Sequence, residues 1–209
     1  MTLLYCYDAY CGWCYGFSDV MKEVNASYKN KLDIEVISGG MILPNDPVHI
    51  SATAGYIDSA YQKVESVTGV KFGSDYLWHI KNPQQSDWYP NSEKPAIALC
   101  IFKEYYPDQQ VLFAADLQYA LHYEGRDLSD DEAYRHLLEK YNIDVDEFNA
   151  KLYDEFYKAE AYAEFDLCKK LNVTGFPAVL LQENESKFHL LARGYTDLHT
   201  LNGRIKPFI

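Results

Sequence analysis

Residues 3–14 read Leu-Leu-Tyr-Cys-Tyr-Asp-Ala-Tyr-Cys-Gly-Trp-Cys, an apolar run that leads into two cysteines separated by two residues. The first five residues of this stretch have the composition of a buried strand. Downstream, apolar residues recur at spacings of three and four, as on one face of a helix: Phe17, Val20, Met21, Val24 and Tyr28. The pair Cys11 and Cys14 is therefore predicted to lie at a strand-to-helix junction.

The position of the pair predicts different roles for the two thiols. Unpaired backbone N–H groups and the partial positive charge of a helix N-terminus stabilise a thiolate by up to ~2 kcal/mol. Because the effect fades within one turn, Cys11 is expected to gain more than Cys14. We predict that Cys11 is the attacking thiolate and that Cys14 resolves the mixed disulfide. Between them lie Gly12 and Trp13, and the indole would either contact substrates or only cover the helix end.

Asp8, three residues before Cys11, has two interpretations. Its carboxylate could relay the proton of Cys14 during exchange, or it could form a turn by accepting nearby backbone N–H groups. As a fixed negative charge it would also oppose a lowering of the Cys11 pKa. The sequence leaves both interpretations open.

The composition indicates a folded protein with an acidic surface. Of 209 residues, 48% are hydrophobic and 15% aromatic, so the formal net charge of −12 is compatible with a sizeable core. Such a surface is a poor partner for nucleic acid. The N-terminal apolar run is not preceded by a basic segment and is interrupted at Asp8, so we expect neither a signal peptide nor a membrane span, and a cytoplasmic location.

Cysteine usage favours chemistry over structural disulfides. The chain has five cysteines, an odd number, and Cys6, Cys100 and Cys168 lie in apolar patterns where we expect small buried side chains. A zinc site is disfavoured because the close pair supplies two ligands and the six histidines show no paired spacing.

The rest of the chain alternates between the apolar patterns of strands and of helices. A second strand over residues 32–37 ends at Gly39 and Gly40, which would make a turn or present backbone donors. Helical patterns then dominate until a long helix over residues 157–171, which is followed by a hairpin over 177–182 and 187–193 and a short final helix. Four helix starts are predicted from capping residues: Asp46-Pro47, Ser74, Ser129 with Glu132, and Asp144 with Glu147.

Two motifs together carry a resemblance to a known family. The dithiol and Val173-Thr174-Gly175-Phe176-Pro177 resemble the thioredoxin superfamily, and the intervening helical block is similar to its DsbA branch. More closely, the chain resembles the FrnE-like predicted protein-disulfide isomerases in these stretches: Tyr7-Asp8 before Cys-Gly-Trp-Cys-Tyr-Gly, Gly39-Gly40-Met41, Tyr123-Glu124-Gly125-Arg126 and Gly175-Phe176-Pro177.

The resemblance implies an α/β, thioredoxin-like fold: a four-stranded mixed sheet with a large helical insertion. Residues 1–45 and 157–209 would form the thioredoxin-like domain, and 46–156 the insertion. It also implies that Pro177 is in the cis form and faces the dithiol, with Phe176 lining the groove. The alternative is a trans proline that only begins an edge strand.

The expected function is a cytoplasmic thiol-disulfide oxidoreductase or isomerase that needs no cofactor. Its partners would be protein or small-molecule thiols and disulfides, with a thiol reductant or a reductase for regeneration, and no nucleic acid, membrane or metal. Two alternatives remain. One is a non-catalytic, redox-sensing protease adaptor with the same fold. The other is a relative of the glutathione-dependent isomerases and transferases, although their first active position is normally serine and here is Cys11.

Overall fold

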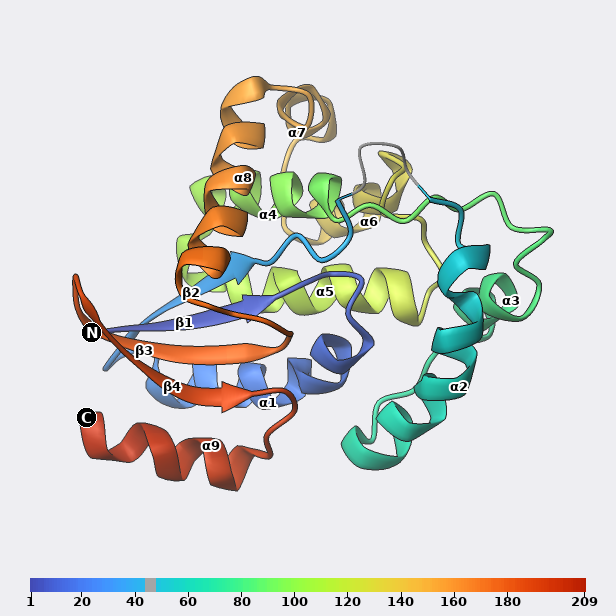
Figure 1. The fold of residues 1–209 in the computed structure, drawn as a ribbon. Coiled ribbons are helices and arrows are strands. Elements are labelled where there is room, and N and C mark those ends of the chain that lie inside the picture. The colour runs from blue at the N-terminus through green and yellow to red at the C-terminus, as the bar shows by residue number, and fades with distance from the viewer. Residues whose placement is uncertain (44–47) are drawn as a thin grey trace.

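A computed structural model describes residues 1–43 and 48–209 (Figure 1). The strands of this part form one sheet in the order β2-β1-β3-β4, with these bounds: β1 Thr2–Tyr7, β2 Asp33–Ser38, β3 Ala178–Asn184 and β4 Lys187–Arg193. β1 pairs in parallel with β2 and antiparallel with β3, which pairs antiparallel with β4. The predicted four-stranded mixed sheet is confirmed.

Alternating residues of β1 face two different helical layers. Leu3, Tyr5 and Tyr7 belong to the larger hydrophobic cluster, on the side of α1 (Gly12–Tyr28) and α9 (Leu198–Ile205). Leu4 and Cys6 face the opposite side, where they pack with Cys168 of α8 (Glu155–Lys170). Figure 1 shows α1 and α9 on one side of the sheet and α8 on the other. Both faces of β1 are thus covered, and the strand leads into the dithiol at the start of α1.

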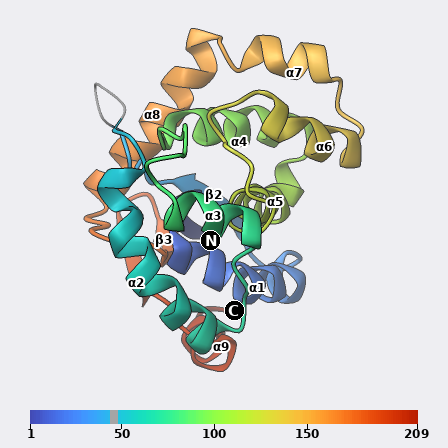
Figure 2. The ribbon, with the colours of Figure 1, turned by 90° about the vertical axis from the view of Figure 1, so that its right-hand side faces the viewer.

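The helical insertion follows β2. Figures 1 and 2 show α2 and α3 beyond the end of the sheet at which β1 leads into α1. Buried residues of the insertion and of the sheet layers join one hydrophobic cluster; the domain division at 46 and 156 stays a prediction. The bounds of the remaining helices are α2 Ser51–Thr68, α3 Ser74–Lys81, α4 Glu93–Tyr105, η1 Pro107–Gln109, α5 Gln110–His122, α6 Glu132–Lys140, α7 Val145–Lys151 and η2 Lys206–Phe208. No helix in the described ranges combines the length and hydrophobicity needed to cross a membrane.

Side chains from three helices cover the free edge of β2. The amide oxygen of Gln110 accepts from Val36 N–H at 2.7 Å, and Lys103 Nζ donates to the Val36 carbonyl at 2.5 Å. Glu164 accepts from Ser38 N–H at 2.7 Å and pairs with Lys103 at 2.5 Å. An edge strand presents backbone N–H and C=O groups that no neighbouring strand pairs. These side chains bond to such groups of β2 and so stabilise the strand that leads to the Gly39-Gly40 turn.

Two of the predicted helix caps are wrong. The carboxylate of Asp127 accepts the Ser129 N–H at 2.9 Å and holds this residue in a turn, so α6 begins only at Glu132, without a side-chain cap. Ser74 is the first residue of α3, and Gly73 occupies the cap position because a Cβ there would overlap the Tyr123 carbonyl oxygen.

One cap prediction is confirmed, and another cannot be compared. The Asp144 carboxylate accepts the Glu147 N–H at 2.8 Å at the start of α7. The predicted cap at Asp46-Pro47 lies outside the described residues.

Candidate active site

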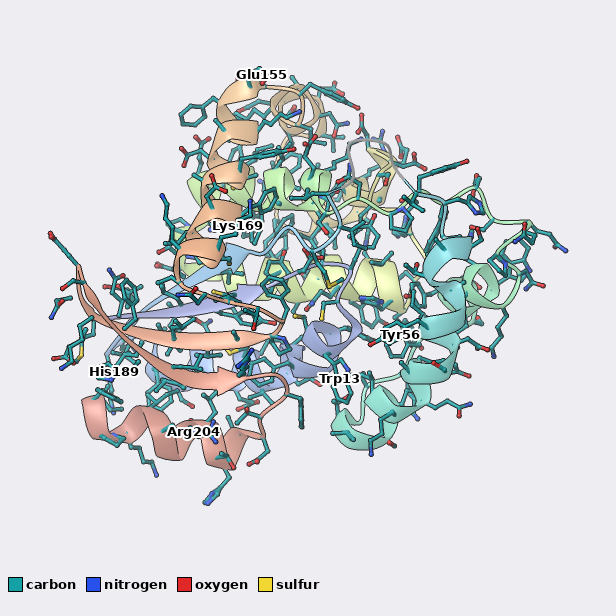
Figure 3. The ribbon with its side chains drawn as sticks, viewed as in Figure 1. Trp13, Tyr56, Glu155, Lys169, His189 and Arg204 are labelled. Atoms are coloured by element: carbon teal, nitrogen blue, oxygen red, sulfur yellow. The ribbon has the colours of Figure 1, made fainter. Side chains whose placement is uncertain are left out.

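The dithiol lies at the junction of β1 and α1. Cys11 is the N-cap of α1, with extended backbone angles of φ −83° and ψ 109°, and Cys14 lies within the first turn. The exposed fraction is 7% for Cys11 and 0% for Cys14. Figure 3 shows Trp13, which is half-buried, at the end of α1 nearest α2. Only Cys11 of the pair retains contact with solvent.

The environment shifts the pKa values of the two thiols in opposite directions. A hydrogen bond from the Cys14 thiol lowers the pKa of Cys11, and the N–H groups of Cys14 and Trp13 add to this effect against burial and the nearby Asp8. Burial raises the pKa of Cys14, and the neighbouring Cys11 raises it further. The pair therefore favours a thiolate on Cys11 and a thiol on Cys14.

Asp8 makes the local contacts of a turn-former and also reaches two distant segments. Its carboxylate accepts from Tyr10 N–H at 3.0 Å, Met41 N–H at 2.7 Å and the Ser92 hydroxyl at 2.9 Å. Burial raises its pKa, and these three bonds oppose the shift. Its backbone carbonyl accepts from Cys11 N–H at 3.1 Å, which closes the turn. The turn-forming interpretation is present in the structure, and the proton relay stays a prediction.

The Phe176–Pro177 segment faces Cys11, as the resemblance implies. The peptide bond between these residues is cis, so the alternative of a trans proline is wrong. The Cys11 thiol donates to the Phe176 carbonyl oxygen at 3.6 Å across a separation of 165 residues. Pro177 is buried and immediately precedes β3. The structure thus brings Cys11, Cys14, Phe176 and Pro177 together.

The Phe176 ring packs against the Gly39-Gly40 turn. A Cβ on Gly39 would overlap the ring of Phe176, and Gly40 has a positive φ of 64°. The Gly39 N–H donates to the Tyr7 carbonyl at 2.7 Å and is therefore not free for a substrate. The turn thus makes room for Phe176, whose half-buried ring contacts the core.

The insertion also contacts the dithiol loop. Phe72, which precedes α3, lies 3.4 Å from the position that a Cβ on Gly12 would occupy. From α5, Gln118 donates to the Asp8 carbonyl at 3.3 Å, and His122 Nε2 lies 3.1 Å from the Ala9 carbonyl. Sequence reasoning missed both α5 residues. The available signal was two polar residues four positions apart, and so on one face, in a mostly apolar helix.

A comparison with protein-family models matches residues 2–206 to the DSBA-like thioredoxin domain. The chain belongs to this family. The predicted resemblance to the DsbA branch is thereby confirmed. A comparison with curated protein sequences finds no significant match.

Several solved structures are similar in fold to this chain. A candidate protein disulfide isomerase from Nitrosomonas europaea is 20% identical with a TM-score of 0.86, over 99% of this chain and 96% of that one. The cytosolic disulfide reductase DsbM from Pseudomonas aeruginosa is 25% identical with a TM-score of 0.70, over 92% and 89% of the two chains. A 2-hydroxychromene-2-carboxylate isomerase is 11% identical with a TM-score of 0.66, over 99% and 95%.

The other thiols of this DsbA-like chain are separate from the dithiol. All five cysteines are free, and Cys6, Cys100 and Cys168 are buried as predicted. Over residues 1–43 and 48–209, the structure contains no cluster of three or more His, Cys, Asp or Glu side chains that could hold a metal ion. Cys11 and Cys14, at the start of α1, form the CxxC pair of the chain.

Proposed function

We propose that this DsbA-family thiol-disulfide oxidoreductase reduces or isomerises substrate disulfides in the cytoplasm. The main support is the asymmetry of the dithiol, in which Cys11 keeps 7% of its surface exposed and has a lowered pKa, whereas Cys14 is completely buried and has a raised pKa. A low-pKa, accessible thiolate is the attacking group in thiol-disulfide exchange.

Exchange would proceed in two balanced steps. The Cys11 thiolate attacks one sulfur of the substrate disulfide, an S–S bond forms between them, and the other substrate sulfur leaves as a thiolate. Cys14 then loses its proton and attacks Cys11 Sγ, which releases the second substrate sulfur and leaves a Cys11–Cys14 disulfide. The substrate gains two electrons and the dithiol loses two. For isomerisation, a different thiolate of the substrate attacks the substrate sulfur of the mixed disulfide before Cys14 does. This forms a new substrate disulfide and releases the Cys11 thiolate.

A thiol reductant or a reductase would restore the dithiol by the reverse exchange. Glutathione is our candidate for the small thiol, because DsbM, 25% identical to this chain with a TM-score of 0.69, has a structure with GSH. The cytosolic assignment of DsbM also supports a cytoplasmic location here. Protein disulfides and small disulfides are both proposed substrates.

Reduction of insulin disulfides tests this proposal. With glutathione as reductant, the wild-type chain should accelerate the reaction and Cys11→Ser should abolish the acceleration. Cys14→Ser should accumulate mixed disulfides that migrate as Cys11-dependent adducts on non-reducing gels, because escape from the first exchange needs the second thiol. Cys100→Ser is the matched control, since its buried thiol lies outside the dithiol and activity should persist.

Two outcomes would favour the alternatives. Wild-type chain that neither turns over insulin nor traps adducts through Cys14→Ser would favour the redox-sensing adaptor. Glutathione-dependent isomerisation of a small molecule that survives Cys11→Ser would favour the isomerase or transferase class, with which the chain shares its fold.

A further inference from the structure

Two polar side chains of α5 point into the interior beside the dithiol loop. Gln118 and His122 lie one helical turn apart, and their exposed fractions are 0% and 1%. The helix around them is otherwise mostly apolar on its buried positions. Buried polar groups carry a desolvation cost unless they are hydrogen-bonded, so their partners indicate why polar side chains stand here.

Both side chains bond to the same turn. Gln118 Nε2 donates to the Asp8 carbonyl at 3.3 Å, and His122 Nε2 lies 3.1 Å from the Ala9 carbonyl. The Asp8 carbonyl also accepts the Cys11 N–H at 3.1 Å. The first two carbonyls of the turn that ends at Cys11 are therefore both tied to one face of α5.

The surroundings of His122 determine its protonation. Its ring lies between the aromatic rings of Tyr15, Phe72 and Tyr76, with centroids at 5.1, 5.4 and 5.0 Å. Burial among these rings lowers the pKa of His122 to about 3. The imidazole is therefore neutral near neutral pH, and the facing carbonyl requires that Nε2 carries the proton.

The second polar atom of each side chain forms no hydrogen bond with the described residues. Gln118 Oε1 and His122 Nδ1 are buried and have no hydrogen-bond partner among the described residues. A Leu or Phe would fill these positions without leaving such atoms unpaired. The one hydrogen bond that each side chain makes among the described residues, to the turn, is what distinguishes it from an apolar residue.

We propose that Gln118 and His122 are positioning residues that hold the Asp8–Cys11 turn and so set the reactivity of the Cys11 thiolate. This inference rests on the proposed function in taking Cys11 as the attacking group. By fixing the turn, the two donors fix the N-cap geometry of Cys11 relative to the N–H groups of Trp13 and Cys14, which stabilise its thiolate. Helix α5 would thus influence the dithiol through the backbone of the turn that precedes it.

Isosteric substitutions separate the donors from the packing. His122→Phe and Gln118→Met each remove one N–H donor and put an apolar side chain of similar size in its place. His122→Gln keeps an N–H near the position of Nε2. The measurement is the rate of Cys11 alkylation by iodoacetamide as a function of pH, followed by mass spectrometry, alongside the melting temperature of each chain.

We expect both donor-less variants to titrate Cys11 at higher pH than wild type and to react about fivefold more slowly near pH 6, the loss expected for one hydrogen bond. His122→Gln should recover most of the wild-type profile. If His122→Phe does not fold, Gln118→Met carries the test. Unchanged profiles in the folded donor-less variants, or a His122→Gln profile no better than that of His122→Phe, would overturn the inference. A wild-type Cys11 that itself titrates like an ordinary thiol near ~8.5 would instead count against the proposed function.

Discussion

His122 should lower the free energy of unfolding at acidic pH, and His122→Phe should remove this contribution. Burial lowers the pKa of His122 from 6.5 to about 3. Between these values the unfolded chain binds a proton at this site and the folded chain does not. The free energy of unfolding therefore falls as pH decreases from about 6.5 towards 3, by about 1.4 kcal/mol per pH unit for one proton. From pH 7 to pH 4.5 the loss from His122 is roughly 2 to 3 kcal/mol.

Urea unfolding at these two pH values measures this loss. His122→Phe lacks the titrating group, so its free energy of unfolding should change less between the two conditions, by the same roughly 2 to 3 kcal/mol. At neutral pH the variant should be less stable by about 1 kcal/mol, because the Ala9 carbonyl loses its donor. Asp8 contributes with the opposite sign, since burial raises its pKa, but it is present in both chains. Parallel pH dependences for wild type and His122→Phe would refute a buried, neutral His122.

Two further predictions concern the thiols and the glycine turn. Iodoacetamide should modify Cys11 first, and at a pH below the ordinary thiol value of ~8.5, while Cys14 should react only after unfolding; peptide mapping that finds Cys14 modified first would contradict the assigned roles. Gly39→Ala should displace the Phe176 ring, lower the free energy of unfolding by about 1 to 3 kcal/mol and slow insulin reduction. Gly55→Ala is the control, because a Cβ at this position in α2 would meet no neighbouring atom. For this control we expect unchanged activity and a free energy of unfolding higher by roughly 0.5 to 1 kcal/mol. Equal melting temperatures of the two variants would refute the packing argument.

The sequence by itself determined the features that depend on local periodicity and on spacing. The apolar run of residues 3–7 and the helical recurrence after Cys14 predicted the strand-to-helix junction. That Pro177 faces the dithiol was implied by the resemblance to the thioredoxin superfamily and not by a local pattern. The hairpin formed by β3 and β4 followed from two extended runs around a polar turn. These signals are local, because backbone geometry sets the period and turn residues set the boundaries.

Only the tertiary structure decided which distant groups meet. Asp8 could be a turn-former on sequence alone, but its bonds to Met41 N–H and to Ser92 required the folded chain. Likewise, Ser74 is a suitable capping residue by type, yet the close approach of Tyr123 placed Gly73 at the cap. The tie between α5 and the dithiol turn is of the same kind. Hydrogen-bond partners separated by a hundred residues depend on how helices pack, and the side-chain period that predicts a helix carries no information about which carbonyl its polar residues will meet.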